Sequence, residues 1–403
     1  TECPAVFIMG KNRGKGRNWL RLLPLLCLAA VLIGGGLTAF AEETLELETP
    51  HAILMEASTG QILFEKDADV PAHPASVTKV MTMLLIMEAL DRGEIDLEEE
   101  VITSAHARSM GGSQVFLEEG EIQTVETLLK CIVIASGNDA AVAMAEHIAG
   151  SEEAFVQRMN ERAAELGMEN THFVDCCGLT DSKEHCTSAR DVALMTRELL
   201  VNHPQITRYS SIWMEDITHE TRRGSTPFTL TNTNKLLRSF EGCDGLKTGS
   251  TSLAKFCLSA TAVRNGIRLI GVVMTSPSSA VRFSEASRLL NYGFGICSLY
   301  RDVHEEEAGE VTVAGGKQET VEGEYEGEFT YLSTSAEDFS RITSQIHWKE
   351  DLRAPVRKGD VLGEQIYFLD EKEIGRSRIL AREEVEKADF GYCLGKLWDY
   401  YRF

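Results

Sequence analysis

The feature that most constrains this chain is an apolar run at 80–87 that directly follows the hexapeptide Pro-Ala-Ser-Val-Thr-Lys at 74–79. Proline suits the first turn of a helix, and no glycine or further proline interrupts the chain before Gly93. Because the run is apolar on nearly every side, we predict a buried helix that continues to about Leu90. Such a helix needs a surrounding core, so the chain must be globular here.

Two polar residues stand at the beginning of this helix. Ser76 and Lys79 are three residues apart and therefore lie on the same face of its first turn. The positive end of a helix lowers the cost of negative charge, and burial disfavours the charged form of lysine. An amine in this place can activate a serine hydroxyl without histidine. A helix cap with a surface lysine is the alternative, and this pattern alone does not decide.

Length and charge limit the classes of protein that fit. A chain of 403 residues exceeds one ordinary core, so two domains are expected. The contents of 43% hydrophobic and 25% charged residues are typical of a globular protein. The net charge of −22 argues against nucleic acid as a partner.

The first part of the chain, residues 1–41, is predicted to be a signal peptide. Basic residues between Lys11 and Arg21 precede a twelve-residue apolar core, Leu22 to Ile33, and Ala-Phe-Ala at 39–41 offers small residues for cleavage. The apolar core is short for a membrane span. We therefore expect an exported protein.

The following segment reads as a hairpin and a series of helices. The turn signal Ser-Thr-Gly at 58–60 separates two apolar runs, at 51–57 and 61–66. Apolar residues at helical spacing predict helices at 124–134, 141–148, 151–166 and 188–201.

A second polar group, Ser136-Gly137-Asn138, falls between two of these helices. A corner held by two buried helices can direct a hydroxyl and an amide into a cleft. An asparagine helix cap with glycine in the turn explains the tripeptide equally simply.

A third group, Lys247-Thr248-Gly249-Ser250, precedes two predicted strands at 255–263 and 267–274. Asn265-Gly266 between these strands is a strong hairpin signal, so the third group lies on or beside a strand of an antiparallel sheet. Lysine supplies a cation, threonine a hydroxyl, and glycine permits close approach of a substrate backbone. Alone, Lys-Thr-Gly would more often be an exposed turn.

Together, Ser-x-x-Lys, Ser-x-Asn and Lys-Thr-Gly occur in the order found in penicillin-binding proteins and class A β-lactamases. The chain resembles the low-molecular-weight penicillin-binding proteins of the D-alanyl-D-alanine carboxypeptidase type, serine peptidase family S11, over about residues 45–295. The words that carry the resemblance are Pro-Ala-Ser-Val-Thr-Lys at 74–79, Gln-Val-Phe-Leu-Glu-Glu-Gly at 114–120, Ser-Gly-Asn-Asp-Ala at 136–140, Asp-Gly-Leu-Lys-Thr-Gly at 244–249 and Leu-Leu-Asn-Tyr-Gly-Phe at 289–294.

The resemblance implies an α+β fold at 42–298, of the β-lactamase/transpeptidase-like type, with an antiparallel sheet, helices on its faces and a helical subdomain. It implies that the enzyme removes the terminal D-alanine from peptidoglycan stem peptides ending in D-Ala-D-Ala, is inhibited by β-lactam antibiotics and needs no cofactor. Ser76 would be the nucleophile and Lys79 its base. Ser136 would protonate the leaving amine, and Asn138 would orient Lys79.

The resemblance also implies the substrate contacts. Lys247 and Thr248 would bind the substrate carboxylate, Gly249 would let the substrate approach, and the N–H groups of Ser76 and Ser250 would form the oxyanion hole. Two other functions stay open: a β-lactamase, and a catalytically silent peptidoglycan-binding protein. Gly137 in place of the usual aspartate disfavours class A β-lactamases.

The loop before the predicted helix at 188–201 departs from the family pattern. It carries adjacent cysteines, Cys176 and Cys177, where relatives usually have other residues, and His185 and Cys186 follow. Export permits disulfides, but the spacing matches no common zinc site. We expect no metal, and we leave both a disulfide and the conformation of this loop open, while the chemistry is kept.

The chain after residue 298 changes character. Short β-type runs between glycines and charged turns predict a small all-β domain at 299–382, and no residue there suggests chemistry. In the tail, 383–403, one helical face carries Phe390, Leu394, Leu397 and Tyr401, which suggests an amphipathic helix at a membrane surface. A terminal helix docked on the core is the alternative.

Overall fold

The computed structural model describes residues 45–221, 224–304 and 307–401. The predicted signal peptide, 1–41, lies outside the described residues. The mixed helix and sheet content, followed by an all-β domain, confirms the predicted fold class. The predicted domain limits stay predictions.

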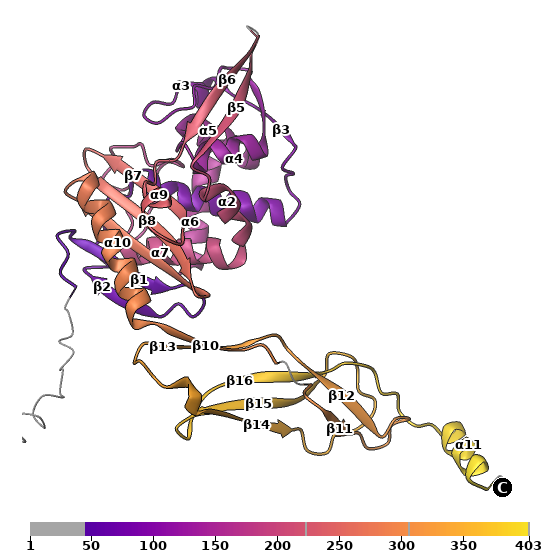
Figure 1. Cartoon of the computed structure of the whole chain (residues 1–403). Helices are drawn as coiled ribbons and strands as arrows, with labels where there is room; N and C mark the ends of the chain where they lie inside the picture. The colour runs from indigo at the N-terminus through magenta and orange to yellow at the C-terminus, as the bar shows by residue number, and fades with distance from the viewer. Residues whose placement is uncertain (1–44, 222–223, 305–306, 402–403) are drawn as a thin grey trace, which may run out of the picture. The chain divides into compact units, whose positions relative to one another are not determined.

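A five-stranded antiparallel sheet forms the centre of the first domain, in the order β2-β1-β9-β8-β7 (Figure 1). Its strands are β1 (His51–Glu56), β2 (Ile62–Lys66), β7 (Cys243–Thr251), β8 (Lys255–Arg264) and β9 (Ile267–Ser276). The β1–β2 and β8–β9 hairpins confirm two sequence predictions. Asn265 and Gly266 both have positive φ, 51° and 79°, as the predicted turn type requires.

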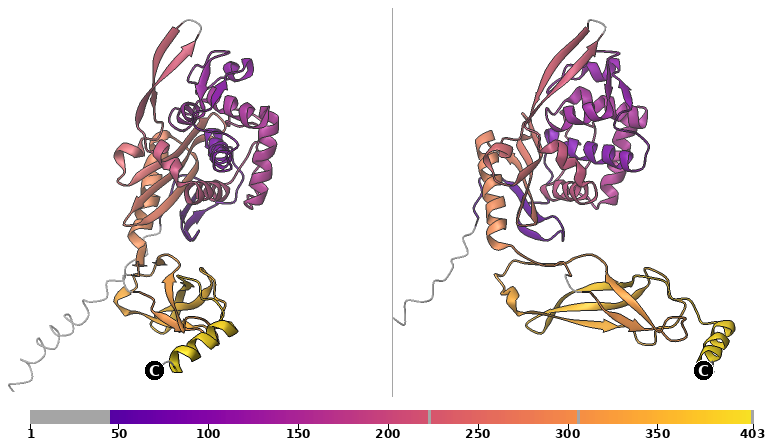
Figure 2. Two further views of the ribbon diagram at one scale, coloured as in Figure 1. Left: turned by 90° about the vertical axis from the view of Figure 1, so that its right-hand side faces the viewer. Right: turned by 45° about the vertical axis from the view of Figure 1, so that its right-hand side comes forward.

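Helices cover both faces of this sheet. Thr196 of α7 (Ala189–Asn202) hydrogen-bonds Ser259 of β8 at 2.8 Å. On the opposite face, Leu289 and Leu290 of α10 (Ser279–Ile296) lie against Gly271 of β9. The views in Figure 2 show α10, in orange, on one side of the sheet and the purple and magenta helices on the other.

The predicted buried helix is present, but its beginning differs. A 3₁₀ turn, η1 (Ala75–Thr78), carries Ser76, and the α-helix α2 (Lys79–Asp91) begins only at Lys79. From Lys79 to Met87 every residue of α2 is buried. The surrounding helices are α4 (Val125–Val133), α5 (Asn138–Ala149) and α6 (Glu152–Glu165).

Local capping explains where the predicted helices start. The side chains of Thr124, Ser151 and Ser188 each accept a hydrogen bond from the backbone N–H three residues further on, at the beginnings of α4, α6 and α7. The prediction for 141–148 began too late, because α5 already starts at Asn138.

Smaller elements complete this domain. The β5–β6 hairpin, Met214–Thr221 with Gly224–Thr231, was not predicted. Its sequence is polar, with few apolar residues to reveal the alternation. The remaining elements are β3 (Glu100–Ile102), α3 (Ala105–Ser109), β4 (Ile122–Thr124), η2 (Pro204–Ile206), α8 (Thr207–Ser210) and α9 (Leu236–Ser239).

The second domain contains only strands and one 3₁₀ turn among its described residues up to 381. One sheet has the order β11-β12-β16-β15-β14, and β10 pairs with β13. Phe329 and Tyr367 stack with ring centroids 3.7 Å apart and connect β13 to β15. The strands are β10 (Ser298–Asp302), β11 (Glu310–Thr312), β12 (Thr320–Tyr325), β13 (Phe329–Ser333), β14 (Ile342–Trp348), β15 (Val361–Leu369) and β16 (Lys372–Ala381), with η3 at Phe339–Arg341.

The tail contains the helix α11 (Phe390–Tyr401). Phe390 and Trp398 are 82% and 70% exposed, and no residue of α11 is buried. Across the described ranges, we find no helix with the length and apolar character needed to cross a membrane.

Candidate active site

The amine of Lys79 lies at the point where the first two sequence motifs meet. Its Nζ is 3.1 Å from Ser76 Oγ, 2.5 Å from Asn138 Oδ1 and 2.9 Å from the carbonyl oxygen of Cys177. Lys79 has no exposed surface, whereas Ser76 is half-buried. The structure therefore places the Ser76 hydroxyl beside a buried amine, while Ser76 itself keeps some exposed surface.

Burial changes the acid–base behaviour of this amine. It lowers the pKa of Lys79, although nearby Cys177, Cys176, Asp175 and Asp139 act in the opposite direction. A charged Lys79 can donate to all three acceptors. A neutral Lys79 has two N–H donors and one lone pair, so the Ser76 hydroxyl can donate to it. This geometry suits proton transfer from Ser76.

Ser136 and Asn138 stand at the beginning of α5. Asn138 accepts from Lys79 and donates through Nδ2 to the carbonyl of Gly111 at 2.7 Å, so its amide orientation is fixed. Ser136 is 3% exposed and has a φ of 63°. Its buried hydroxyl finds no hydrogen-bond partner among the described residues.

The third motif lies on β7, as predicted. Lys247 is 1% exposed, and its Nζ donates to the carbonyl of Thr248 at 3.1 Å. Burial holds the pKa of Lys247 well below its usual range, and the charges of Lys79 and Arg282 lower it further. Thr248 Oγ1 lies 2.6 Å from Thr233 Oγ1, and Ser250 is exposed.

Gly249 joins this strand to the nucleophile. A Cβ at this position would lie 2.6 Å from the carbonyl oxygen of Pro74 and 3.0 Å from the backbone nitrogens of Ser76 and Val77. Only glycine permits this approach. Because β7 passes directly against η1, the N–H of Ser76 lies beside the Lys-Thr-Gly segment.

Arg282 is a site-supporting residue that the sequence did not reveal. It projects from α10 and donates through Nη1 to the carbonyls of Gly249, at 3.2 Å, and Cys257, at 3.3 Å. Burial lowers the pKa of this guanidinium to about 10. A lone arginine in an amphipathic helix gives no signal of this role.

The loop with the two adjacent cysteines supplies the third acceptor of Lys79. The Asp175 carboxylate accepts from the backbone N–H groups of Cys177, Gly178, Leu179 and Thr180 and so sets the turn. The carbonyl of Cys177, rather than its thiol, contacts Lys79.

The cysteines themselves are not bonded to one another. All eight in the described ranges are free, so the disulfide left open by the sequence is absent from this part of the chain. Within the same ranges, no group of three or more His, Cys, Asp or Glu side chains is arranged to hold a metal ion.

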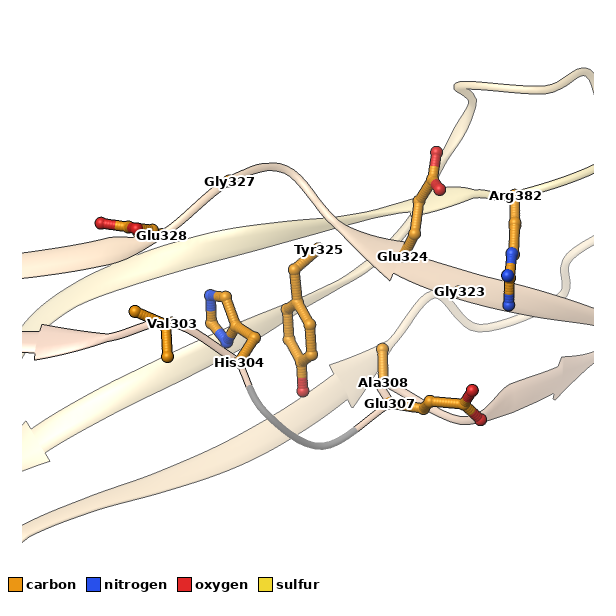
Figure 3. A pocket seen from close by; sticks show the side chains of 10 residues that line it. All are labelled: Val303, His304, Glu307, Ala308, Gly323, Glu324, Tyr325, Gly327, Glu328 and Arg382. Carbon is orange, nitrogen blue, oxygen red and sulfur yellow. The ribbon is translucent and has the colours of Figure 1, made fainter.

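A separate hollow of about 450 Å³ lies in the β domain (Figure 3). His304 stacks on Tyr325 there, with ring centroids 3.7 Å apart and planes 7° from parallel. Glu324 and Arg382 lie further along the hollow. None of the three motifs lines it.

Comparison with known proteins agrees with this geometry. The family profile of D-alanyl-D-alanine carboxypeptidases matches residues 38–278, and that of the penicillin-binding protein 5 C-terminal domain matches residues 302–387. The chain is 40% identical over 379 residues to the D-alanyl-D-alanine carboxypeptidase DacF of Bacillus subtilis, an alignment covering 92% of this chain and 96% of that relative.

Solved structures give the same result. Penicillin binding protein 5 from Haemophilus influenzae matches with a TM-score of 0.67 and 30% identity, over 85% of this chain and 98% of that one. A peptidoglycan synthesis regulatory factor from Streptococcus pneumoniae matches with a TM-score of 0.69 and 29% identity, over 85% and 100%.

Fold and site together define a serine-type peptidase of the penicillin-binding class. The chain belongs to the D-alanyl-D-alanine carboxypeptidase family, and the resemblance and enzyme class predicted from the sequence are confirmed.

We expect Gly249→Ala to slow acylation strongly, because the added methyl group would displace β7 from the backbone of Ser76. The rate of labelling by a fluorescent penicillin should fall at least about a hundredfold, as misplacement by about 1 Å can cost. Gly295→Ala, in α10 with no atom within 4 Å of the added Cβ, is the control and should keep the full rate. Equal labelling of the two variants would contradict the close contact.

Proposed function

We propose that Ser76 attacks the carbonyl between the two terminal D-alanines of a peptidoglycan stem peptide and releases the last D-alanine through an acyl-enzyme. The observation that carries this proposal is the 3.1 Å contact between Ser76 Oγ and a fully buried Lys79 amine. In this scheme neutral Lys79 accepts the hydroxyl proton as the Oγ–carbon bond forms.

The backbone N–H groups of Ser76 and Ser250 are proposed to hold the developing oxyanion. The approach of Gly249 to the Ser76 nitrogen supports this assignment, since it sets the two donors on neighbouring backbones. Losing one such donor typically costs about 3 kcal/mol of barrier.

Collapse of the tetrahedral intermediate breaks the carbon–nitrogen bond, and the departing amine needs a proton. Ser136 is proposed to deliver it, drawing on the proton that Lys79 accepted. The buried Ser136 hydroxyl without a partner among the described residues supports this role. Asn138 keeps Lys79 in place through its fixed amide.

The substrate carboxylate is proposed to bind at Lys247 and Thr248. Arg282 acts on Lys247 at short range, and its pKa of about 10 keeps it charged near neutral pH, which favours an anionic group here. Water then hydrolyses the Ser76 ester and frees the enzyme. A β-lactam, which presents a reactive amide and a carboxylate, would acylate the same serine.

The setting of the enzyme is a further proposal. The basic and apolar segments within 1–41 support export, and we propose that the mature protein works at the outer face of the cell membrane. The exposed apolar residues of α11 support attachment to the membrane surface.

Ser76→Ala should remove all covalent labelling by a fluorescent penicillin, because no other group would be acylated. Ser109→Ala, an exposed serine in α3, is the matched control and should label normally. The adduct mapped by mass spectrometry should lie on Ser76 and persist for many minutes. Label on another side chain would refute the nucleophile, and rapid turnover of penicillin would indicate a β-lactamase.

The acylation rate should rise with pH and level off above the pKa of Lys79, which burial lowers. Below that pKa the amine is charged and cannot accept the Ser76 proton. Lys79→Arg keeps the charge at every pH, so acylation should fall about 10² to 10⁴-fold. Lys130→Arg, in an ion pair on α4, should leave the rate unchanged. A Lys79→Arg variant that acylates at the normal rate would exclude Lys79 as the base.

Replacing two apolar residues of α11, Leu394→Glu with Leu397→Glu, should weaken co-sedimentation with phospholipid vesicles at least about tenfold, since both side chains would leave the apolar phase. Gly391→Glu with Gly395→Glu adds the same charge at the glycine positions and should bind as the unmodified chain does. Equal binding by both double variants would argue against an α11 anchor.

A further inference from the structure

The histidine that accompanies the paired cysteines has contacts of its own. His185 is 2% exposed, its Nε2 lies 2.8 Å from Thr78 Oγ1, and the backbone N–H of Val174 donates to its Nδ1 at 3.0 Å. Its carbonyl oxygen accepts from His73 Nδ1 at 3.0 Å. One residue therefore contacts the segment that carries Ser76 at two points and the cysteine loop at a third.

These contacts fix the protonation state of the ring. A backbone N–H can only donate, so Nδ1 must carry a lone pair. The single ring proton is then on Nε2, which donates to the Thr78 hydroxyl. A second proton on Nδ1 would point at the Val174 N–H and break that hydrogen bond.

The same two segments meet again beside the reacting groups. Gly178 lies so close to the nucleophile turn that a Cβ there would overlap the carbonyl oxygen of Ala75 and lie 2.7 Å from Thr78 Oγ1. The preceding carbonyl, of Cys177, accepts from Lys79. Ala75 has a φ of 47°, a conformation that persists only where its surroundings impose it.

We propose that His185 is a positioning residue whose neutral imidazole fastens the turn carrying Ser76 to the loop that supplies an acceptor for Lys79. Uptake of a proton by this ring loosens the loop and slows acylation. This inference rests on the proposed roles of Ser76 and Lys79.

The charges around the ring favour the neutral form. Burial lowers the pKa of His185, the positive forms of His73 and His172 act in the same direction, and only Asp175 opposes them. The Asp175 carboxylate is already occupied by four backbone N–H groups. The pKa of His185 is lower in the folded chain than in the unfolded chain, where it is ~6.5. The contribution of neutral His185 to folding stability is therefore complete above the unfolded-state pKa, and it is lost as the pH falls through the folded-state pKa.

The test is the pH profile of acylation by a fluorescent penicillin, between about pH 4.5 and 8. In the unmodified chain both Lys79 and His185 must be neutral for acylation. A plot of the logarithm of the rate against pH should therefore steepen from a slope near one to a slope near two at the acid end. His185→Asn does not titrate, and its side-chain oxygen can accept from Val174. This variant should be slower at pH 8, about tenfold, and its slope should stay near one.

His203→Asn is the matched control, because His203, which follows α7, is also buried but pairs with Asp91, the last residue of α2. The pH profile of this variant should keep the slope near two at the acid end. A His185→Asn profile parallel to that of the unmodified chain at every pH would overturn the proposal, whatever its height.

A second measurement needs neither activity nor a variant that folds. Nitrogen NMR of the histidine rings in the unmodified chain should show His185 with its proton on Nε2 and a pKa below the usual value. A proton on Nδ1, or an ordinary pKa, would overturn the proposal. Failure of Ser76-dependent labelling would count against the proposed function instead, because this NMR readout does not depend on it.

Discussion

The structure depends on one buried amine. Lys79 has no exposed surface, and its three acceptors come from η1, α5 and the cysteine loop. An amine taken out of water is costly unless acceptors surround it, and removing one partner of a buried charge can cost about 3–5 kcal/mol. The three segments must therefore meet at one point, and their meeting lowers the pKa of the base that the reaction needs.

Close backbone contacts rather than side chains bring the third motif to this point. Two glycines approach the turn that carries Ser76: Gly249 from strand β7, and Gly178 from the loop with the paired cysteines. Each contact excludes any larger residue, so the turn with its strained Ala75 is held between two backbones. Arg282 secures the first contact through the carbonyl of Gly249, and His185 secures the second through Thr78.

The sequence predicted those elements of the structure that depend on residues close together in the chain. The apolar periodicity of α4 to α7 and the Asn265-Gly266 turn identified elements of the fold. The order of the three motifs identified the candidate site residues, whose catalytic roles stay predictions. The 3₁₀ turn before Lys79 and the early start of α5 were missed, because tertiary contacts fix them. Arg282 and His185 were missed as supporting residues for the same reason: their partners are backbone atoms and hydroxyls distant in sequence, and such partners leave no pattern.

The paired cysteines show why a departure from the family pattern need not change the chemistry. The loop gives Lys79 a carbonyl oxygen, and a carbonyl is present whatever side chain follows it. The position of this carbonyl depends on the conformation of the loop. That conformation is set by the Asp175 carboxylate, which accepts hydrogen bonds from four backbone N–H groups, and by Gly178, which has a φ of 78°. The constraint therefore falls on Asp175, Gly178 and His185. Cys176 and Cys177 only have to fill buried space, which small apolar thiols do well.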